Sequence, residues 1–316
     1  MTLVSTGAAT PLAGAAALGT FEFGTAAIPD DRGRQLLDNY QELGGRLIDT
    51  APTYGPAGGA FRAEPLIGTW LRDSGTTGMR VITKAGLDPT RPGRGDLRPE
   101  AIIASARRSA ECLGRAVVLL LHRDNPAVPV AEIADAADRA VREGTAEQVG
   151  ASNWTTTRLT AWADHAAAAH LAAPTVTAPL WSLIPRADPP AEPGLVEADP
   201  GHLAMAARHG MTVIPYRTLA AGYLAARHSG RHAHHHTGTY DTAPGRERRD
   251  RLHQAAAAMR MTPHGLALAY LRAHRPAPVI PVIGPRTLQQ LTESMAGAAQ
   301  AGRVTPELAA YLEARP

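Results

Sequence analysis

Residues 46–55 of the chain read Arg46-Leu47-Ile48-Asp49-Thr50-Ala51-Pro52-Thr53-Tyr54-Gly55. A short apolar run ends at an aspartate, and a turn then places a tyrosine five residues further on. This pattern is typical of a strand that ends in a functional loop rather than in a structural turn. The stretch therefore predicts a strand with Asp49 at its end and Tyr54 in the loop that follows.

Outward from this stretch, short β-like runs alternate with amphipathic helical segments about eight times. The predicted strands cover residues 15–20, 46–50, 80–84, 117–122, 147–152, 174–179, 211–216 and 277–284. The predicted helices cover residues 31–43, 64–73, 99–113, 130–142, 155–170, 199–208, 248–274 with a break near Pro263, and 287–299. Eight strand–helix units without a change in composition predict an α/β fold, a (β/α)8 TIM barrel with a single domain over residues 1–316. The main alternative is a doubly wound open sheet, but no glycine-rich phosphate fingerprint follows the first strand.

The composition argues against several classes of protein. The chain has 316 residues, is 44% hydrophobic and contains no uninterrupted apolar run of about eighteen residues, so we expect no membrane span. Residues 1–20 have no basic residue ahead of their apolar stretch, which makes a poor secretory signal, and we expect a cytoplasmic protein. The single cysteine, Cys112, cannot form an internal disulfide. With a net charge of +3 and few aromatics, neither nucleic acid nor a membrane is expected as a partner.

Polar residues are scarce inside the predicted strands and gather at their ends. The strand ends carry Asp49, Lys84, His122, Ser152 with Asn153, and Tyr216. In a (β/α)8 barrel the chemistry lies at the C-terminal ends of the strands, so this placement indicates one site. Lys84 is also the only lysine of the chain. An amine can sit close to another group and tune its proton affinity, which a guanidinium does poorly.

Four of these residues make chemical sense together as a proton-transfer site. The hydroxyl of Tyr54 is too weak an acid to act near neutral pH unless a cation such as Lys84 stabilises the phenolate. A buried ammonium tends to lose its proton, and the carboxylate of Asp49 can hold the charge in place. His122 can then donate a hydrogen bond to a substrate oxygen and orient it toward Tyr54.

With their neighbours, these residues strongly resemble the motifs of the aldo-keto reductases. The matching segments are Asp49-Thr50-Ala51-Pro52-Thr53-Tyr54-Gly55, Thr83-Lys84, Leu120-Leu121-His122-Arg123-Asp124, Leu18-Gly19-Thr20, Gly150-Ala151-Ser152-Asn153-Trp154 and Gly284-Pro285-Arg286-Thr287. The resemblance extends from about Leu18 to about Ala299, and the order and spacing of the motifs make it highly specific.

The resemblance implies an enzyme, an NADPH-dependent oxidoreductase that reduces an aldehyde or ketone on a (β/α)8 barrel. In that family the matching residues give Tyr54 the role of general acid, Lys84 and Asp49 the role of tuning it, and His122 that of orienting the carbonyl. The implied cofactor contacts are Gly19, Thr20, Ser152, Asn153, Tyr216, Arg217, Leu219, Gly284, Arg286, Thr287, Gln290 and Ser294. Ser152 and Asn153 match the residues that hold the nicotinamide carboxamide, and Tyr216 matches the aromatic residue that stacks on the nicotinamide ring. Arg286 matches the basic residue that meets the 2′-phosphate of NADPH (NADP+).

The chain departs from the family pattern at three places near the cofactor. The family usually has a glutamine near Ala178 that helps to hold the carboxamide, and none is present here. The usual Ser-Pro-Leu after Tyr216 reads Arg217-Thr218-Leu219, where Arg217 either reaches the pyrophosphate or lies in solvent. Ser294 stands where an asparagine commonly faces the adenine.

Several aromatic residues follow the predicted strands, where they either wall a substrate pocket or cap the sheet structurally. The pocket candidates are Phe21, Phe23, Trp154 and Trp181. They favour a small, partly apolar carbonyl substrate. Two other functions stay open: a regulatory or sensor barrel that binds the cofactor with little turnover, and a redox-neutral isomerase or lyase that uses the same acid–base residues.

A histidine-rich segment covers residues 228–236. A structural metal site needs ligands fixed by a framework, whereas this segment is rich in Gly, Arg and His and follows the seventh predicted strand. We expect it to be a solvated or cofactor-covering loop, with no metal bound.

Overall fold

The structure is a computed structural model of the chain, and it describes residues 12–56, 62–87, 95–187, 194–225, 239–273 and 275–314. One sheet of eight parallel strands runs through these residues, in the order β7-β6-β5-β4-β3-β2-β1-β8. The strands are β1 (Ala17–Gly19), β2 (Leu47–Asp49), β3 (Arg80–Ala85), β4 (Val117–Leu121), β5 (Ala146–Ser152), β6 (Pro174–Ala178), β7 (Thr212–Val213) and β8 (Val282–Ile283). Each predicted strand overlaps one of them, which confirms the α/β prediction.

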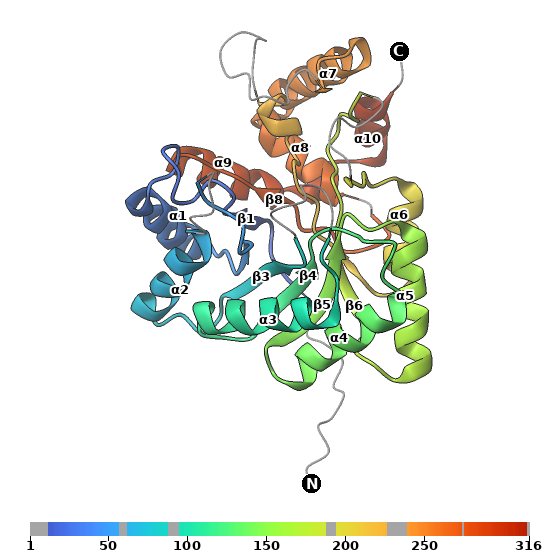
Figure 1. Cartoon of the computed structure of the whole chain (residues 1–316). Coiled ribbons are helices and arrows are strands. Elements are labelled where there is room, and N and C mark those ends of the chain that lie inside the picture. The colour runs from blue at the N-terminus through green and yellow to red at the C-terminus, as the bar shows by residue number, and fades with distance from the viewer. Residues whose placement is uncertain are drawn as a thin grey trace.

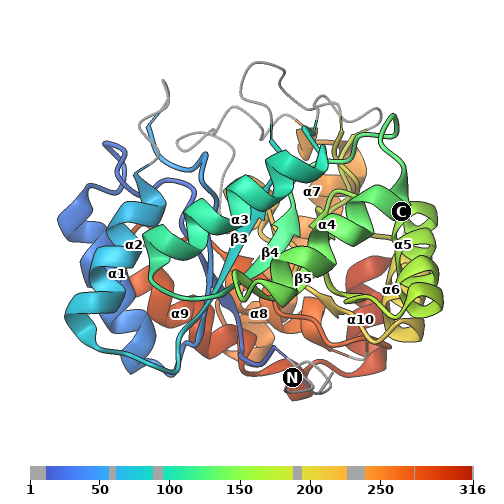
Figure 2. The ribbon, with the colours of Figure 1, turned by 60° about the horizontal axis from the view of Figure 1, so that its bottom comes forward.

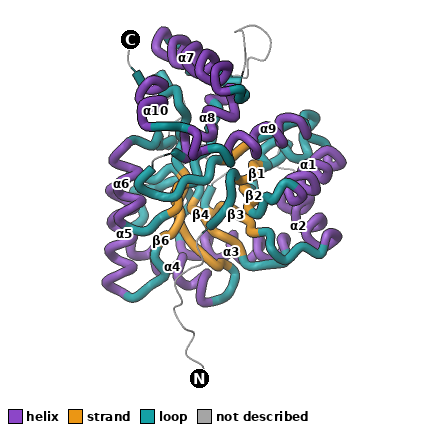
Figure 3. Tube along the Cα trace, turned by 180° about the vertical axis from the view of Figure 1, so that it is seen from behind, coloured by secondary structure: helices purple, strands orange, loops and turns teal. Residues whose placement is uncertain are grey.

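Helices separate the strands and surround the sheet (Figures 1 and 3). In the described residues they are α1 (Asp30–Glu42), α2 (Ala63–Ser74), α3 (Pro99–Leu113), α4 (Val130–Arg142), α5 (Thr156–Ala169), α6 (Pro200–Arg208), α7 (Ala243–Met259), α8 (Pro263–Arg272), α9 (Leu288–Ala298) and α10 (Pro306–Glu313), with short 3-10 turns η1 (Ala220–Gly222) and η3 (Ala301–Arg303). The predicted break at Pro263 is confirmed, because this proline is the first residue of α8. Helix α10 lies beyond the last predicted helix.

Alternate residues of the strands pack into two separate hydrophobic clusters. The outer cluster includes Ile48, Val81 and Leu119 together with the helices. The inner cluster consists of Leu12, Ala17, Leu47, Ile82, Val118, Leu120, Val176, Ala178, Ile214 and Ile280. A sheet whose two faces are both buried in this way has the layers of a barrel, with a core inside the sheet and a larger core under the helices.

The two edges of the sheet approach each other. Strands β7 and β8 are not paired as strands, yet the backbone just before β8 contacts β7. Val213 N donates to Pro278 O at 2.8 Å, Ile280 N donates to Val213 O at 2.9 Å, and Val282 N donates to Pro215 O at 2.9 Å. The sheet is therefore curled like a half-barrel, consistent with the predicted (β/α)8 barrel.

Prolines explain why β7 and β8 are shorter than predicted. The predicted strand 211–216 contains Pro215, and the predicted strand 277–284 contains Pro278 and Pro281. Because proline has no N–H to donate, it interrupts a ladder of hydrogen bonds. Each strand keeps only two residues in regular pairing.

The helices pack against one another along the outside of the strands, as Figure 2 shows for α2, α3, α4 and α5. Helix α8 packs on α9 at a point where both helices carry glycine: a Cβ added to Gly297 would lie 2.2 Å from the Cα of Gly265. This close approach lets the C-terminal turn of α9 pack directly on the first turn of α8. No helix in the described residues is long and apolar enough to cross a membrane.

Candidate active site

Asp49, Lys84 and His122 lie at the C-terminal ends of the neighbouring strands β2, β3 and β4. Asp49 is the last residue of β2, Lys84 is the penultimate residue of β3, and His122 directly follows β4. Each lies two residues beyond an inner-cluster residue of its own strand. Because side chains alternate along a strand, all three therefore face the inside of the curled sheet.

The ammonium of Lys84 is paired and buried. Its Nζ donates to Asp49 Oδ1 at 2.8 Å and to the backbone oxygen of Thr50 at 2.8 Å. Lys84 and Asp49 are each only 5% exposed. The same Nζ lies 4.7 Å from the ring centroid of Tyr54, so the tyrosine is in direct contact with a buried charge pair.

The surroundings set the charge states of this pair. Burial favours the neutral form of Lys84, but the charges and hydrogen bonds of Asp49 and Tyr54 together outweigh it and raise the pKa of Lys84. Burial raises the pKa of Asp49, and Lys84 opposes this effect. The carboxylate thus keeps the buried amine protonated, as the residue types predicted.

Tyr54 stands in the loop after β2, where its backbone N donates to Ala51 O at 3.0 Å. Its ring meets the ring of Phe21 edge-on at 5.2 Å and that of His122 at 6.1 Å. Burial raises the pKa of Tyr54, while the charge of Lys84 and a hydrogen bond from it act in the opposite direction. The phenol is therefore protonated at neutral pH, which a proton donor requires, and a cation lies ready to stabilise its phenolate.

His122 is 8% exposed, and its backbone N donates to Ala85 O at 2.9 Å. Burial, followed by the positive charges of Lys84 and Arg123, lowers the pKa of His122 well below its ordinary value. The imidazole is therefore neutral at physiological pH. A neutral imidazole carries one N–H, which can donate a hydrogen bond to a ligand oxygen.

Gly19 and Thr20 follow β1 and support the same site from one side. The hydroxyl and the backbone N of Thr20 both donate to the backbone oxygen of Asp49 at 3.0 Å. A Cβ at Gly19 would lie 2.7 Å from a side-chain carbon of Val282, so this position needs glycine for its close approach to β8.

The residues predicted to hold a carboxamide form one hydrogen-bonded group. Ser152 Oγ donates to the backbone oxygen of Ala178 at 3.0 Å, and Asn153 Nδ2 donates to Ser152 Oγ at 2.9 Å. The hydroxyl of Tyr216 donates to Asn153 Oδ1 at 2.5 Å, and burial raises the pKa of Tyr216. Asn153 also donates weakly to the backbone oxygen of His122 at 3.5 Å. The structure thus brings these three residues together beside the acid–base group.

The residues predicted to meet the phosphates surround the N-terminus of α9. Thr287 Oγ1 accepts from Gln290 N at 3.2 Å, and Gln290 Oε1 accepts from Arg286 N at 2.8 Å. These two bonds cap the helix reciprocally. Gly284 is exposed, with no atom within 4 Å of the position of an added Cβ, and Ser294 is buried within α9.

Sequence reasoning missed a partner of Arg286. The guanidinium of Arg286 donates through Nε to Glu22 Oε2 at 2.6 Å and through Nη2 to Glu22 Oε1 at 2.5 Å. Glu22 lies in the loop after β1, which is far from Arg286 in sequence. Its acidic residue type alone carried no signal, and only the pairing of β1 with β8 brings the two loops together.

Arg217 and Leu219 lie between β7 and η1, and both are partly buried. Leu219 packs against the outer cluster, and Arg217 has a left-handed backbone with φ 53°.

The predicted pocket aromatics do not share one environment. Phe21 is 67% exposed and contacts Tyr54, whereas Phe23 and Trp154 have no exposed surface and belong to the outer cluster. Trp181 is buried, with the guanidinium of Arg275 4.9 Å above its ring. Phe23, Trp154 and Trp181 thus pack in the outer cluster, whereas the ring of Phe21 is exposed beside Tyr54.

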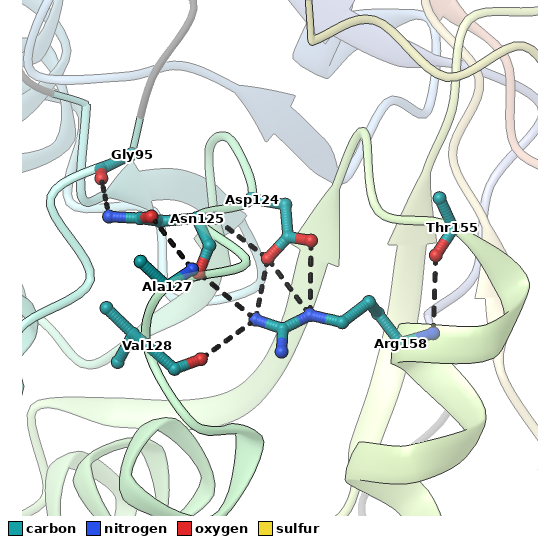
Figure 4. Close-up of polar contacts among 7 residues, drawn as sticks. All are labelled: Gly95, Asp124, Asn125, Ala127, Val128, Thr155 and Arg158. Carbon is teal, nitrogen blue, oxygen red and sulfur yellow. Dashed lines mark hydrogen bonds and ion pairs between the residues drawn. The ribbon is translucent and has the colours of Figure 1, made fainter.

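A cavity of about 490 Å3 adjoins the site at the ends of β4 and β5. It is lined by Asp124, Asn125, Pro126, Ala127, Asn153, Thr155, Gly194 and Val196. Figure 4 shows that Arg158, from the first turn of α5, holds Asp124 with both Nε and Nη2. The Arg158 guanidinium also lies 5.0 Å from the ring centroid of Trp154. Arg158 therefore connects Asp124, in the lining of this cavity, to the buried Trp154.

The histidine-rich segment 228–236 lies outside the described residues. In the part of the chain that the structure describes, there is no group of three or more His, Cys, Asp or Glu side chains that could hold a metal ion.

The sequence model of the Aldo/keto reductase family matches residues 16–313. The chain therefore belongs to the Aldo/keto reductase family, a family of oxidoreductases that generally use nicotinamide cofactors. No individual curated protein matched the chain. The matched region includes α10, which the motif resemblance alone did not reach.

Proposed function

We propose that this protein is an NADPH-dependent reductase that converts an aldehyde or ketone to an alcohol, with Tyr54 as the general acid. The single observation that carries the proposal is the contact of Tyr54, whose hydroxyl is protonated, with the buried Lys84–Asp49 ion pair. The hydrogen bonds between β7 and the segment before β8 support a closed (β/α)8 barrel as the scaffold.

When bound, the nicotinamide supplies a hydride to the carbonyl carbon. The chain provides the proton. His122, neutral and buried, donates a hydrogen bond to the carbonyl oxygen and orients it. Tyr54 gives its proton to the oxygen as negative charge develops there, and Lys84 stabilises the phenolate that results. Asp49 keeps Lys84 charged throughout.

The residues at the end of β8 fit a nucleotide phosphate. Exposed Gly284 leaves open space, the N-terminus of α9 presents backbone N–H groups, and Arg286 carries a planar fork of donors that Glu22 engages in this structure. These features support NADPH as the cofactor. The hydrogen-bonded group of Asn153 and Tyr216 supports placement of the nicotinamide beside it.

The proposed substrate is a small carbonyl compound with an apolar part. The exposed ring of Phe21 against Tyr54 supplies an apolar surface at the site, while the cavity beside Asn153 is largely apolar and carries a few polar side chains, Asn153 among them. A substrate with its carbonyl near Tyr54, its apolar part against Phe21 and a polar group near Asn153 fits these surfaces.

Tyr54→Phe tests the proposal directly. We expect NADPH consumption with a panel of aldehydes and ketones to fall about 100- to 10,000-fold, since this is the usual contribution of a general acid. NADPH binding, measured by fluorescence titration, should stay nearly unchanged. Tyr311→Phe is the matched control, because Tyr311 is 43% exposed on α10. Unchanged turnover in Tyr54→Phe would refute the assignment of the acid.

The same assay separates the two other functions. NADPH binding without consumption by any carbonyl compound would support a sensor. Product formation without a net change in NADPH would support an isomerase or lyase.

A further inference from the structure

The pair of Glu22 and Arg286 joins the loop after β1 to the loop after β8. Two parallel hydrogen bonds of 2.6 and 2.5 Å connect the carboxylate to the guanidinium. The loops are held together because β1 pairs with β8 in parallel, and Figure 1 places α9 beside these strands. The carboxylate thus occupies the Nε–Nη2 edge of the guanidinium, whose two parallel donors can also bind the oxygens of another anion.

The position of Arg286 is set by its backbone, not by Glu22. Its N–H donates to Gln290 Oε1, and the next residue, Thr287, caps α9. The side chains of Arg286 and Glu22 are 38% and 31% exposed. Because both side chains are partly exposed, a ligand anion can reach the guanidinium and compete with the carboxylate for its donors.

A dianionic phosphate and a hydroxyl respond differently to this carboxylate. A phosphate must either displace Glu22 from Arg286 or bind beside its negative charge, and both lower its affinity. A ribose hydroxyl is uncharged and can bind with the pair intact, or donate a hydrogen bond to the carboxylate.

We propose that Glu22 is a specificity-determining residue that competes with the 2′-phosphate of NADPH for Arg286 and so narrows the preference for NADPH over NADH. This inference rests on the proposed function, because a nicotinamide nucleotide must bind at α9. Glu22 carries it independently of the proton-transfer residues, which lie at the ends of β2, β3 and β4.

The test is Glu22→Gln, which keeps the size of the side chain and removes its charge. Dissociation constants for NADPH and NADH are measured by fluorescence titration at fixed ionic strength. We expect NADPH to bind about fivefold to tenfold tighter and NADH to change by less than about twofold. The matched control is Glu147→Gln, which removes an ion pair with Arg80 at the N-terminal ends of β3 and β5. This variant should leave both dissociation constants unchanged.

A double-mutant cycle with Arg286→Ala shows whether Glu22 acts through this arginine. In the Arg286→Ala background, Glu22→Gln should no longer change the ratio of the two affinities. Weaker NADPH binding by Glu22→Gln, an equal change for both nucleotides, or an altered ratio that persists without Arg286 would each overturn the inference. A wild-type protein that binds neither nucleotide would overturn the proposed function as well, whereas binding with an unmoved ratio overturns the inference alone.

Discussion

The buried charge pair makes a prediction about Asp49→Asn. Removing one partner of a buried ion pair costs about 3–5 kcal/mol of stability, because the other charge is left uncompensated. Asparagine keeps the size of the side chain and an oxygen that can accept from Lys84. We therefore expect the variant to fold with a free energy of unfolding lower by about 3–5 kcal/mol at pH 7.

The pH dependence distinguishes this cause from a simple packing defect. In the wild type the pKa of Lys84 is raised in the folded state, so its contribution is fully present below the unfolded value of about 10.4 and is lost only as the pH rises through the folded pKa. In Asp49→Asn, burial acts without the carboxylate and lowers the folded pKa of Lys84 below the unfolded value. The unfolded chain then binds more protons, and the stability of the variant rises with pH up to about 10.4.

The difference in the free energy of unfolding between the wild type and Asp49→Asn should therefore shrink by about 1.4 kcal/mol per pH unit. This holds between the folded-state and the unfolded-state pKa of Lys84 in the variant. Urea unfolding followed by tryptophan fluorescence at several pH values between neutral and about 10 measures it. Asp138→Asn serves as control, since Asp138 is also buried but pairs with Arg142, whose side chain is 70% exposed. The difference in the free energy of unfolding between the wild type and Asp138→Asn should stay constant with pH. If the difference for Asp49→Asn is constant with pH as well, the role of Asp49 in keeping Lys84 charged is refuted.

Two further substitutions test the scaffold around the site. Gly150→Ala places a Cβ 2.0 Å from a backbone oxygen of β6, so we expect a loss of at least about 2 kcal/mol in urea unfolding, whereas Gly302→Ala, with open space around it, should change stability by less than about 1 kcal/mol. Arg158→Met removes the ion pair with Asp124 and the stacking on Trp154, and we expect a loss of about 1–3 kcal/mol by the same measurement. A neutral result for Gly150→Ala or Arg158→Met would contradict the packing described for β5 or α5.

The acid–base residues were predictable from sequence because their placement follows from local rules. A strand alternates its side chains, neighbouring parallel strands in this fold are consecutive in the chain, and polar residues end three of them. Those rules suffice to bring Asp49, Lys84 and His122 to one face. The lengths of β7 and β8 did not follow, because the hydrophobic pattern predicts where a strand runs but the prolines determine which residues pair.

The orientation of the loop aromatics did not follow from the sequence, for a related reason. Position after a strand does not tell whether a ring turns outward, like Phe21, or inward, like Phe23 and Trp154. Trp154 turns inward because Trp162 and Arg158 on α5 offer it a stacking surface, with the two indole rings 5.6 Å apart. That surface comes from the tertiary packing of a helix, which residue types alone do not reveal.

The contact between Glu22 and Arg286 shows why cofactor selectivity is harder to predict than catalysis in this fold. The two residues are 264 positions apart and meet only because the last strand pairs with the first. An arginine at the end of β8 predicts affinity for a phosphate, yet its donors are shared with a carboxylate from the other end of the chain. The proposed catalytic group depends on three consecutive strands, whereas the proposed selectivity at Arg286 depends on how the sheet brings its first and last strands together. A substitution at Glu22 should therefore alter the choice of nucleotide while leaving the proposed proton transfer by Tyr54 intact.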